Sequence, residues 1–263
     1  MIGSERKIEA AVCCHIGGGR GNNEDNYYLD GTWKHLENKD RNQLLSDSRN
    51  QPALFAVCDG MGGQQYGEMA SLVAVSWIHE SRDAFLRGAQ PEKEGSAILS
   101  RLSKQLWQFC QERKYRMGST IVIAAIRENG IYTYGLGDSR IYLLEAGKLQ
   151  QLTQDHTVAA EAELMGLTDG QPLSPSDPRS HQLTQYFGMD CGEYDPAPSC
   201  AYRRLQPGQR ILLCSDGLSD CLNNDQLTLA LACESPLESV QQLVNMALER
   251  GGTDNITAMV LKV

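Results

Sequence analysis

Residues 54–63 read LFAVCDGMGG, an apolar run that stops at an aspartate and continues in glycines. An apolar run between breakers predicts a buried strand, and a carboxylate followed by glycine marks a strand end that is open for chemistry. Residues 211–217, ILLCSDG, repeat the pattern, and residues 134–140, YGLGDSR, vary it. A further aspartate precedes the last apolar run of the chain. These patterns predict one shared site built from the strand-end aspartates Asp59, Asp138, Asp216 and Asp254.

Strands and helices are predicted in separate groups along the chain. Residues 120–126, 131–136 and 140–144 are rich in Ile, Val and Tyr and are joined by short turns, which predicts antiparallel strands. Apolar residues recur at helical spacing over 69–77 and 98–109, and a capping box at Ser235 predicts another helix. Because strands and helices do not alternate regularly, we expect an α+β fold with antiparallel sheets packed under helices.

Two segments differ in composition from the rest of the chain. Residues 31–52 are mostly hydrophilic and are predicted to form a hairpin tip or a surface connection. Residues from 155 to about 199 are long, irregular and rich in proline, which is typical of a functional lid or a mobile insert. No linker resembles a domain boundary, so we expect a single domain over residues 1–263 with a lid insert at about 155–199.

Composition excludes several classes of partner. The formal net charge of −9 disfavours nucleic acid and anionic lipid. No apolar run approaches the roughly 20 residues that span a bilayer, and the N-terminus lacks a secretory pattern. We therefore expect a cytoplasmic protein with no nucleic-acid or membrane partner. The nine cysteines lack paired Cys-x-x-Cys spacing, which predicts neither a zinc site nor a disulfide framework.

The strand-end aspartates predict a cation. Carboxylates held within a few ångström repel one another, and their pKa values rise unless a cation compensates them. Oxygen ligands without nearby His or Cys favour Mg²⁺ or Mn²⁺ over softer metals, with Ca²⁺ a weaker alternative. Taken singly, each of these residues also fits an ordinary turn aspartate.

Five ordered motifs resemble those of a known enzyme family. They are RGNNED at 20–25, DGMGG at 59–63, GDSR at 137–140, SDGL at 215–218 and DNIT at 254–257. In this order and over nearly the whole chain, they are similar to the metal-dependent serine/threonine protein phosphatases, the PPM or type-2C family, of the bacterial branch.

The resemblance implies a four-layer α+β sandwich of two central antiparallel β-sheets flanked by α-helices, with the metals at one end. By the family pattern, Asp59 bridges two core Mn²⁺ or Mg²⁺ ions and Gly60 lends its carbonyl oxygen. Asp216 and Asp254 complete that pair of ions.

The remaining motif residues take further roles by the same resemblance. Asp25 and Glu24 act on the metals largely through metal-bound water. Of the two, Glu24 acts through water alone. Asp138 together with Asp216 holds a third, weaker ion. Arg20 binds the substrate phosphate, for which its planar guanidinium is suited.

The implied activity is hydrolysis of phosphoserine and phosphothreonine in proteins. A hydroxide that bridges the two ions attacks the phosphoryl group directly, without a phosphoenzyme. The implied partners are phosphorylated proteins opposed to a Ser/Thr kinase, and we expect a monomer.

The chain departs from the family pattern at two places. Many relatives carry a histidine within or just after the Asp-Gly motif, where this chain has Met61 and Gln64. Relatives of this branch often have an arginine after Leu-Thr in the lid, where this chain has Gln185. We therefore expect a different source for the leaving-group proton and different substrate contacts in the lid.

Two alternatives stay open at the level of sequence. The first is a catalytically weak or dead family member that acts as a phosphoprotein-binding scaffold. The second, more remote, is a cysteine-dependent phosphatase, because Cys14 and Arg20 satisfy the Cys-x5-Arg spacing of a phosphate loop.

Overall fold

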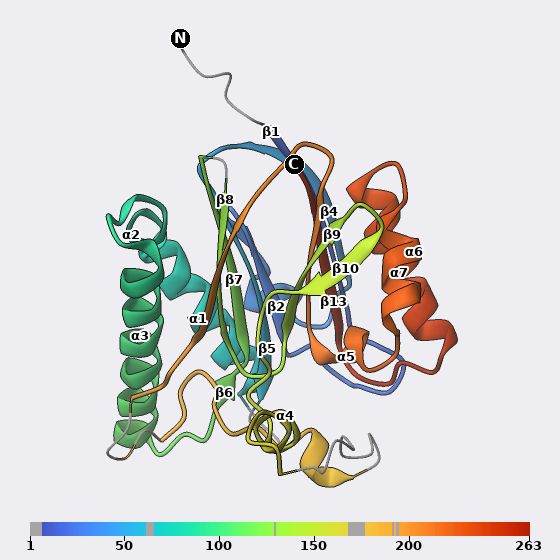
Figure 1. Ribbon diagram of the computed structural model, residues 1–263. Helices are drawn as coiled ribbons and strands as arrows, with labels where there is room; N and C mark the ends of the chain where they lie inside the picture. Colours follow the sequence, from blue (N-terminus) through green and yellow to red (C-terminus); the bar gives the residue numbers. More distant parts are fainter. Residues whose placement is uncertain (1–6, 62–65, 129, 168–176, 191, 193–194) are drawn as a thin grey trace.

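A computed structural model describes residues 7–61, 66–128, 130–167, 177–190, 192 and 195–263 of the chain (Figure 1). In these ranges, the strands form one six-stranded and one seven-stranded sheet, and every pairing is antiparallel. The sheets face each other, and helices cover both outer faces (Figure 1). The predicted four-layer α+β sandwich is confirmed.

The six-stranded sheet joins the two ends of the chain. Its order is β10 (Lys148–Gln151), β9 (Arg140–Glu145), β12 (Arg210–Cys214), β13 (Ile256–Lys262), β1 (Lys7–His15) and β4 (Gln43–Asn50). β1 and β13 pair from Glu9 opposite Lys262 to His15 opposite Ile256. The loop after β1 therefore begins where β13 begins.

The seven-stranded sheet contains the strand that decides the fold. Its order is β11 (Ser199–Arg204), β8 (Gly130–Leu136), β7 (Ile121–Arg127), β5 (Ala53–Met61), β2 (Asp25–Leu29) and β3 (Thr32–Trp33), and the short β6 (Gly118–Ser119) pairs with the end of β5. Phe55 and Val57 of β5 face the other sheet, whereas Leu54, Ala56 and Cys58 face the helices. A strand that is buried on both faces has a continuous apolar sequence, which is why this run is so distinct.

The helices fall into two layers and a separate group. α1 (Gly67–Glu80), α2 (Arg82–Arg87) and α3 (Pro91–Arg113) cover the seven-stranded sheet; α5 (Asp216–Ser219), α6 (Asn224–Leu231) and α7 (Pro236–Glu249) cover the other (Figure 1). The short helices η1 (Leu36–Asn38), α4 (Val158–Leu164) and η2 (Pro178–Ser180) lie outside these layers. The predictions of α1, α3 and α7 are confirmed, including the capping box of Ser235 with Glu238.

The prediction for residues 31–52 was wrong in one respect. This segment contains β4, which pairs with β1 over eight residues, from Lys7 opposite Asn50 to Cys14 opposite Gln43. β4 is an edge strand with no fully buried side chain. It therefore lacks the apolar alternation by which a strand is recognised in a sequence.

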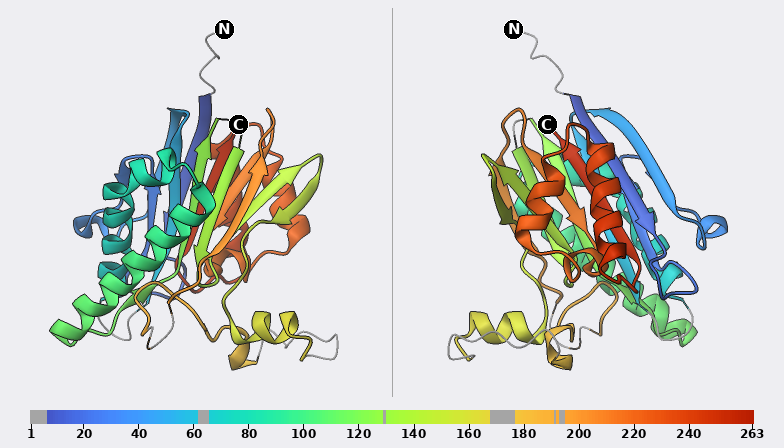
Figure 2. Two further views of the ribbon diagram at one scale, coloured as in Figure 1. Left: turned by 60° about the vertical axis from the view of Figure 1, so that its left-hand side comes forward. Right: turned by 90° about the vertical axis from the view of Figure 1, so that its right-hand side faces the viewer.

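The described parts of segment 155–199 lie beyond one end of the sheets. Both views of Figure 2 place α4 and η2 there. The backbone bridge between Ser119 and Phe187 attaches the segment to the sandwich, and the bridge between Thr157 and Leu183 joins two parts of the segment itself. We refer to residues 155–199 as the lid segment. None of the helices in the described ranges is long and apolar enough to cross a membrane.

Gly95 of α3 offers a test of the packing between this helix and its sheet. A Cβ at this position would lie 2.2 Å from Cζ of the buried Tyr134 on β8. Gly→Ala in a helix interior normally stabilises by roughly 0.5–1 kcal/mol. We expect Gly95→Ala instead to lower the free energy of unfolding by about 1–3 kcal/mol, because of overpacking.

Urea unfolding of the wild type and of Gly95→Ala measures this change. Lys93→Ala, at an exposed position of the same helix, is the control and should leave stability nearly unchanged. A Gly95→Ala protein that is as stable as the wild type would contradict the described contact.

Candidate active site

The predicted site residues converge at the end of the sandwich that carries the lid segment. A pocket of about 460 Å³ is lined by seven of them, namely Arg20, Glu24, Asp59, Gly60, Asp138, Asp216 and Asp254. The eighth, Asp25, is fully buried and stands directly opposite Asp59 in the β2–β5 register. The structure thus brings together all eight residues named from the sequence.

The topology explains this convergence. Asp59 lies at the end of β5, and Asp216 begins α5 directly after β12. Asp138 lies in the turn from β8 to β9, and Asp254 precedes β13. Because these strands are antiparallel, the ends of β5, β8 and β12 and the starts of β9 and β13 meet at one edge.

Gly60 has to be glycine for a steric reason. Its N–H donates to the carbonyl oxygen of Glu24 at 3.2 Å. A Cβ on Gly60 would lie 2.0 Å from the carbonyl oxygen of Gly67, at the start of α1. The end of β5, the loop before β2 and the start of α1 can therefore meet only at a residue without a side chain.

The buried carboxylates perturb one another. Burial raises the pKa of Asp59 well above its ordinary value, and the neighbouring Asp25 and Asp216 raise it further. Burial and then Asp216 raise the pKa of Asp138 to about 8. Burial raises the pKa of Asp25 to about 6. Burial is the largest cause of each shift, and neighbouring negative charges add to it.

Two of the buried oxygens lack a partner. In the described part of the chain, neither Oδ1 of Asp25 nor Oδ1 of Asp216 forms a hydrogen bond. Buried polar atoms are nearly always paired. A hard divalent cation takes oxygen ligands of this kind, so the residues present fit such an ion.

Asp254 forms a bidentate ion pair with Arg20. Arg20 donates from Nε to Oδ1 of Asp254 at 2.8 Å and from Nη2 to Oδ2 at 2.6 Å. Both carboxylate oxygens are thus occupied by one guanidinium. Within the described residues, no three Asp, Glu, His or Cys side chains are placed to hold a metal ion without rearrangement.

Asn255 organises the loops around the pocket, a role that was not assigned from the sequence. Its Oδ1 accepts from the N–H of Glu24 at 2.7 Å. Its Nδ2 donates to the carbonyl oxygens of Ile16 at 2.8 Å and Asn22 at 2.9 Å. Asn255 therefore fixes the loop that carries Arg20 and Glu24 to the start of β13. Its place next to Asp254 in the DNIT motif was the available signal.

Buried hydroxyl groups support the carboxylates from behind. Ser215 donates from Oγ to Oδ2 of Asp25 at 2.7 Å, and its Oγ accepts from the N–H of Thr257 at 3.0 Å. Thr120 Oγ1 accepts from the N–H of Asp59 at 3.2 Å and is 2.6 Å from Oγ of Ser139. Single serines and threonines carry no distinctive sequence signal, so these supports were missed.

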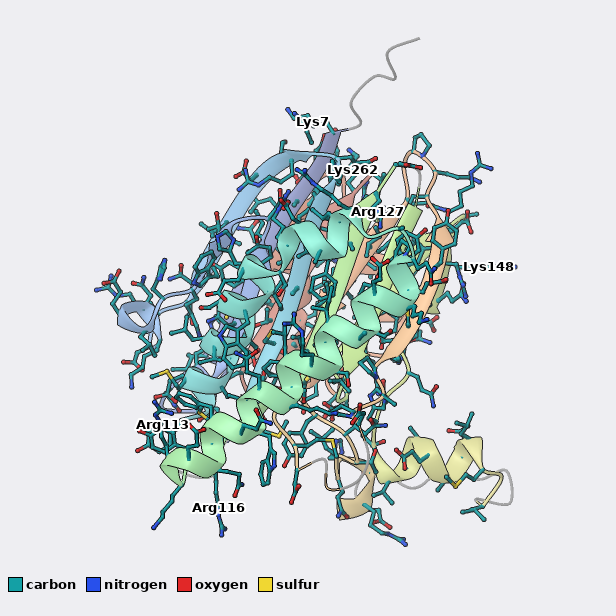
Figure 3. All side chains as sticks on the ribbon, turned by 90° about the vertical axis from the view of Figure 1, so that its left-hand side faces the viewer. Lys7, Arg113, Arg116, Arg127, Lys148 and Lys262 are labelled. Atoms are coloured by element: carbon teal, nitrogen blue, oxygen red, sulfur yellow. The ribbon has the colours of Figure 1, made fainter. Side chains whose placement is uncertain are left out.

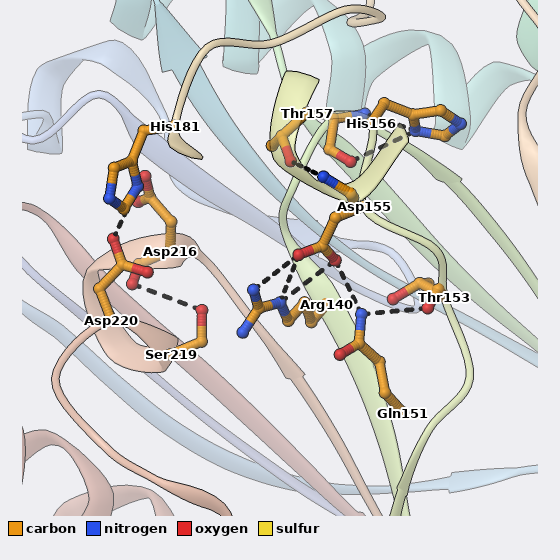
Figure 4. Close-up of polar contacts among 12 residues, drawn as sticks. Arg140, Gln151, Thr153, Asp155, His156, Thr157, His181, Asp216, Ser219 and Asp220 are labelled. Atoms are coloured by element: carbon orange, nitrogen blue, oxygen red, sulfur yellow. Dashed lines mark hydrogen bonds and ion pairs between the residues drawn. The ribbon is translucent and has the colours of Figure 1, made fainter. Parts of the chain in front are cut away.

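One histidine, His181, lies at the site, although no role was assigned to it from the sequence. This residue of the lid segment lines the same pocket as the carboxylates. Its Nδ1 is 3.4 Å from Oδ2 of Asp220 on the turn after α5, and Figure 4 shows it beside Asp216. The lid segment was expected, but the lack of ligand spacing around His181 hid its position.

The base of the lid segment is fixed by a second carboxylate–guanidinium pair. Arg140 donates from Nε and Nη2 to Oδ2 of Asp155 at 2.9 and 2.6 Å (Figure 4). Gln151 donates to Oδ1 of Asp155 at 2.7 Å. The chain therefore enters the lid segment from a rigid point.

The chain departs from the family pattern at three positions, and the structure describes two of them. Met61 lines the pocket beside Gly60. Gln64 lies outside the described residues. Gln185 accepts from the N–H of Ala197 at 2.8 Å, a contact within the lid segment.

The structure does not support Cys14 as a nucleophile. Cys14 is fully buried in β1, and burial raises the pKa of its thiol. Its Sγ lies 3.3 Å from Nδ2 of Asn23 and 3.8 Å from the carbonyl oxygen of Asp25. A reactive cysteine needs access and a lowered pKa. The cysteine-dependent alternative is therefore rejected.

The pKa of Asp138 generates a testable pH dependence. Its pKa rises from 3.8 to about 8 on folding, so the folded chain binds more protons than the unfolded chain between these values. Linkage then requires the free energy of unfolding to fall as pH rises through this window. In EDTA, we expect the wild type to be less stable at about pH 8 than at about pH 5.5, and Asp138→Asn to reduce this difference.

Urea unfolding in EDTA at the two pH values provides the measurement. Glu80→Gln, on the exposed end of α1, should behave like the wild type. If Asp138→Asn and the wild type show the same pH dependence, Asp138 does not carry the unfavourable charge.

Comparison with known proteins agrees with this geometry. A family model described as Protein phosphatase 2C matches residues 33–259. Serine/threonine protein phosphatase PstP of Mycobacterium tuberculosis is 32% identical over 211 residues, which cover 80% of this chain but only 40% of PstP. Protein phosphatase PhpP of Streptococcus pneumoniae is 28% identical over 267 residues, which cover 97% of this chain and 98% of PhpP.

A solved structure shows the same relationship. The catalytic domain of PstP in complex with two manganese ions superposes with a TM-score of 0.76 at 27% identity, over 98% of this chain and 99% of that chain. The match to the family model over most of the sequence, together with these relatives, shows that the chain belongs to the protein phosphatase 2C family.

Proposed function

We propose that this chain is a metal-dependent phosphatase of phosphoserine and phosphothreonine in proteins. The observation that carries the proposal is the pocket in which four aspartates meet one arginine, with Asp25 buried opposite Asp59. One oxygen of Asp25 and one of Asp216 have no hydrogen-bond partner among the described residues. The names of PstP and PhpP support the substrate class. The match spans only 40% of PstP, so we propose the activity for this chain and do not assign it from PstP.

The residues present would hold two core ions, Mn²⁺ or Mg²⁺. Asp59, Asp216, Asp254 and the carbonyl oxygen of Gly60 would contribute to this pair. Asp25 and Glu24 would act largely through water, and Asp138 with Asp216 would take a third, weaker ion. The manganese complex of PstP supports a two-ion site. When bound, such ions lower the pKa of water and neutralise charge on the phosphoryl group.

Arg20 would bind the phosphate, and it would have to leave its ion pair with Asp254 to do so. The guanidinium now engages both oxygens of Asp254. A phosphate dianion is a stronger partner for the planar guanidinium than a carboxylate is. Transfer of Arg20 to phosphate would therefore release Asp254 toward the other carboxylates. Binding of substrate and cation would be coupled through this exchange.

The pocket favours direct attack by water over a covalent intermediate. Among the described residues that line it, the one hydroxyl side chain is Thr120. Its Oγ1 is already bonded to the N–H of Asp59 and to Ser139. No hydroxyl side chain of the described lining is thus free to act as a nucleophile.

Activity measurements test this proposal. We expect hydrolysis of p-nitrophenyl phosphate and of a phosphothreonine peptide in Mn²⁺, loss of both in EDTA, and recovery when Mn²⁺ is restored. Asp59→Asn should lower kcat by roughly 100-fold or more, because it removes a ligand charge from the ion pair. Asp83→Asn, at an exposed position of α2, is the charge-matched control and should not change kcat.

Two outcomes would contradict the proposal. Activity that survives EDTA but is lost in Cys14→Ser would restore the cysteine-dependent alternative. Binding of Mn²⁺ and of the phosphopeptide without any turnover would favour the scaffold alternative, in which the pocket recognises phosphoproteins but does not hydrolyse them.

A further inference from the structure

A second, larger pocket lies beside the candidate active site. Its volume is about 840 Å³, and its wall is formed mainly by the end of α3, the turn that follows it and residues 186–190 of the lid segment. The residues that matter for its chemistry are Met61, Trp107, Lys114, Tyr115, Arg116 and Tyr186. We call it the α3 pocket. None of the residues assigned above to cations or phosphate lines it.

The two pockets share a wall. Met61 lines both of them. It is the last residue of β5, and it pairs with Gly118 of β6 directly after Gly60 pairs with Ser119. A polypeptide with its phosphorylated residue at Arg20 and Asp59 can therefore pass over Met61 into the α3 pocket. An extended chain advances about 3.3 Å per residue, so the residues that enter are near neighbours of the phosphorylated one.

The α3 pocket has positive charge in a chain of net charge −9. Lys114 and Arg116 are exposed at its rim, and within the described residues neither forms an ion pair. Figure 3 shows Arg116, with Arg113, at the far end of α3. Asp190 is the one acidic residue in the lining. Two unpaired cations next to an acidic catalytic pocket are complementary to an acidic ligand.

The backbone holds these cations in place. α3 ends at Arg113, and the next residue, Lys114, has φ +57°, a left-handed conformation that is usually occupied by glycine. The N–H of Tyr115 then donates to the carbonyl oxygen of Cys110 at 2.9 Å. The turn over residues 114–116 is thus fixed to the helix, and Met117 leads directly into β6.

Aromatic side chains give the same pocket an apolar wall. Trp107, Tyr115 and Tyr186 line it and are each half-buried. The Tyr115 ring is supported by Tyr66 at a centroid distance of 4.8 Å. Aromatic walls of this kind bind aliphatic or aromatic side chains with little loss of conformational entropy.

We infer that the α3 pocket is a specificity subsite for an acidic segment next to the phosphorylated residue of a protein substrate. It would hold an Asp or Glu side chain at Lys114 and Arg116 and an apolar or aromatic side chain between Trp107, Tyr115 and Tyr186. This inference rests on the proposed phosphatase function, because that function places the phosphorylated residue in the adjacent pocket.

Two phosphothreonine peptides test the inference. They differ only in the residues flanking phosphothreonine, which are Glu, Asp and Phe in one and Gln, Asn and Ala in the other. For the wild type in Mn²⁺, we expect kcat/KM to be about tenfold higher for the acidic peptide, from two partly exposed charge pairs and one buried ring. Lys114→Gln/Arg116→Gln should lower this ratio several-fold and leave only the part that the Phe ring contributes.

Lys148→Gln is the matched control. Lys148 is an exposed cation on β10, far from the end of α3 (Figure 3), and its removal should leave the ratio unchanged. The wild-type preference should also weaken as NaCl is raised, because exposed charge pairs are screened. An absent preference in the wild type, or the same preference in the double variant, would overturn the inference.

Direct binding separates this inference from the proposed function. If p-nitrophenyl phosphate is not hydrolysed in Mn²⁺, the phosphatase proposal fails. Fluorescence anisotropy with the two labelled peptides then still decides the subsite. Tighter binding of the acidic peptide to the wild type than to the double variant would support it, and equal binding would overturn it.

Discussion

The mutual repulsion of buried carboxylates is the constraint on which the rest of this structure depends. Asp25, Asp59, Asp138 and Asp216 are drawn from four separate parts of the chain into one end of the sandwich. Burial and like charge raise the pKa of each. A flexible assembly would relax by moving these groups apart. They stay together because each is attached to a strand end or turn of two sheets that pack against one another.

The pairing of the two chain ends positions Arg20 and Asp254 at the site. β1 and β13 run side by side, and the N–H groups of Gly18 and Gly19 donate to the carbonyl oxygens of Gly252 and Thr253 at 2.9 and 3.0 Å. A Cβ on Gly17 would lie 1.8 Å from the carbonyl oxygen of Asp254. The loop therefore follows residues 252–254 closely, which places Arg20 on Asp254. The same contact that blocks Asp254 thus prepares the guanidinium for an anion.

The sequence predicted much of this, and the reasons for the exceptions are physical. β5 was evident because both of its faces are buried, and α7 was evident because Ser235 and Pro236 begin it. β4 was missed because it is an exposed edge strand. Aspartates and glycines at strand ends marked the site, but His181 and Asn255 enter it only through long-range contacts. Local spacing cannot reveal such contacts.

Anomalous scattering from crystals grown with Mn²⁺ is the measurement that tests the central claim most directly. The account predicts manganese peaks within the pocket of Asp59 and Asp216, with Arg20 released from Asp254, and no such peaks in Asp59→Asn. Crystals of the wild type without manganese in this pocket, or with Asp254 still paired to Arg20 beside fully bound ions, would contradict it.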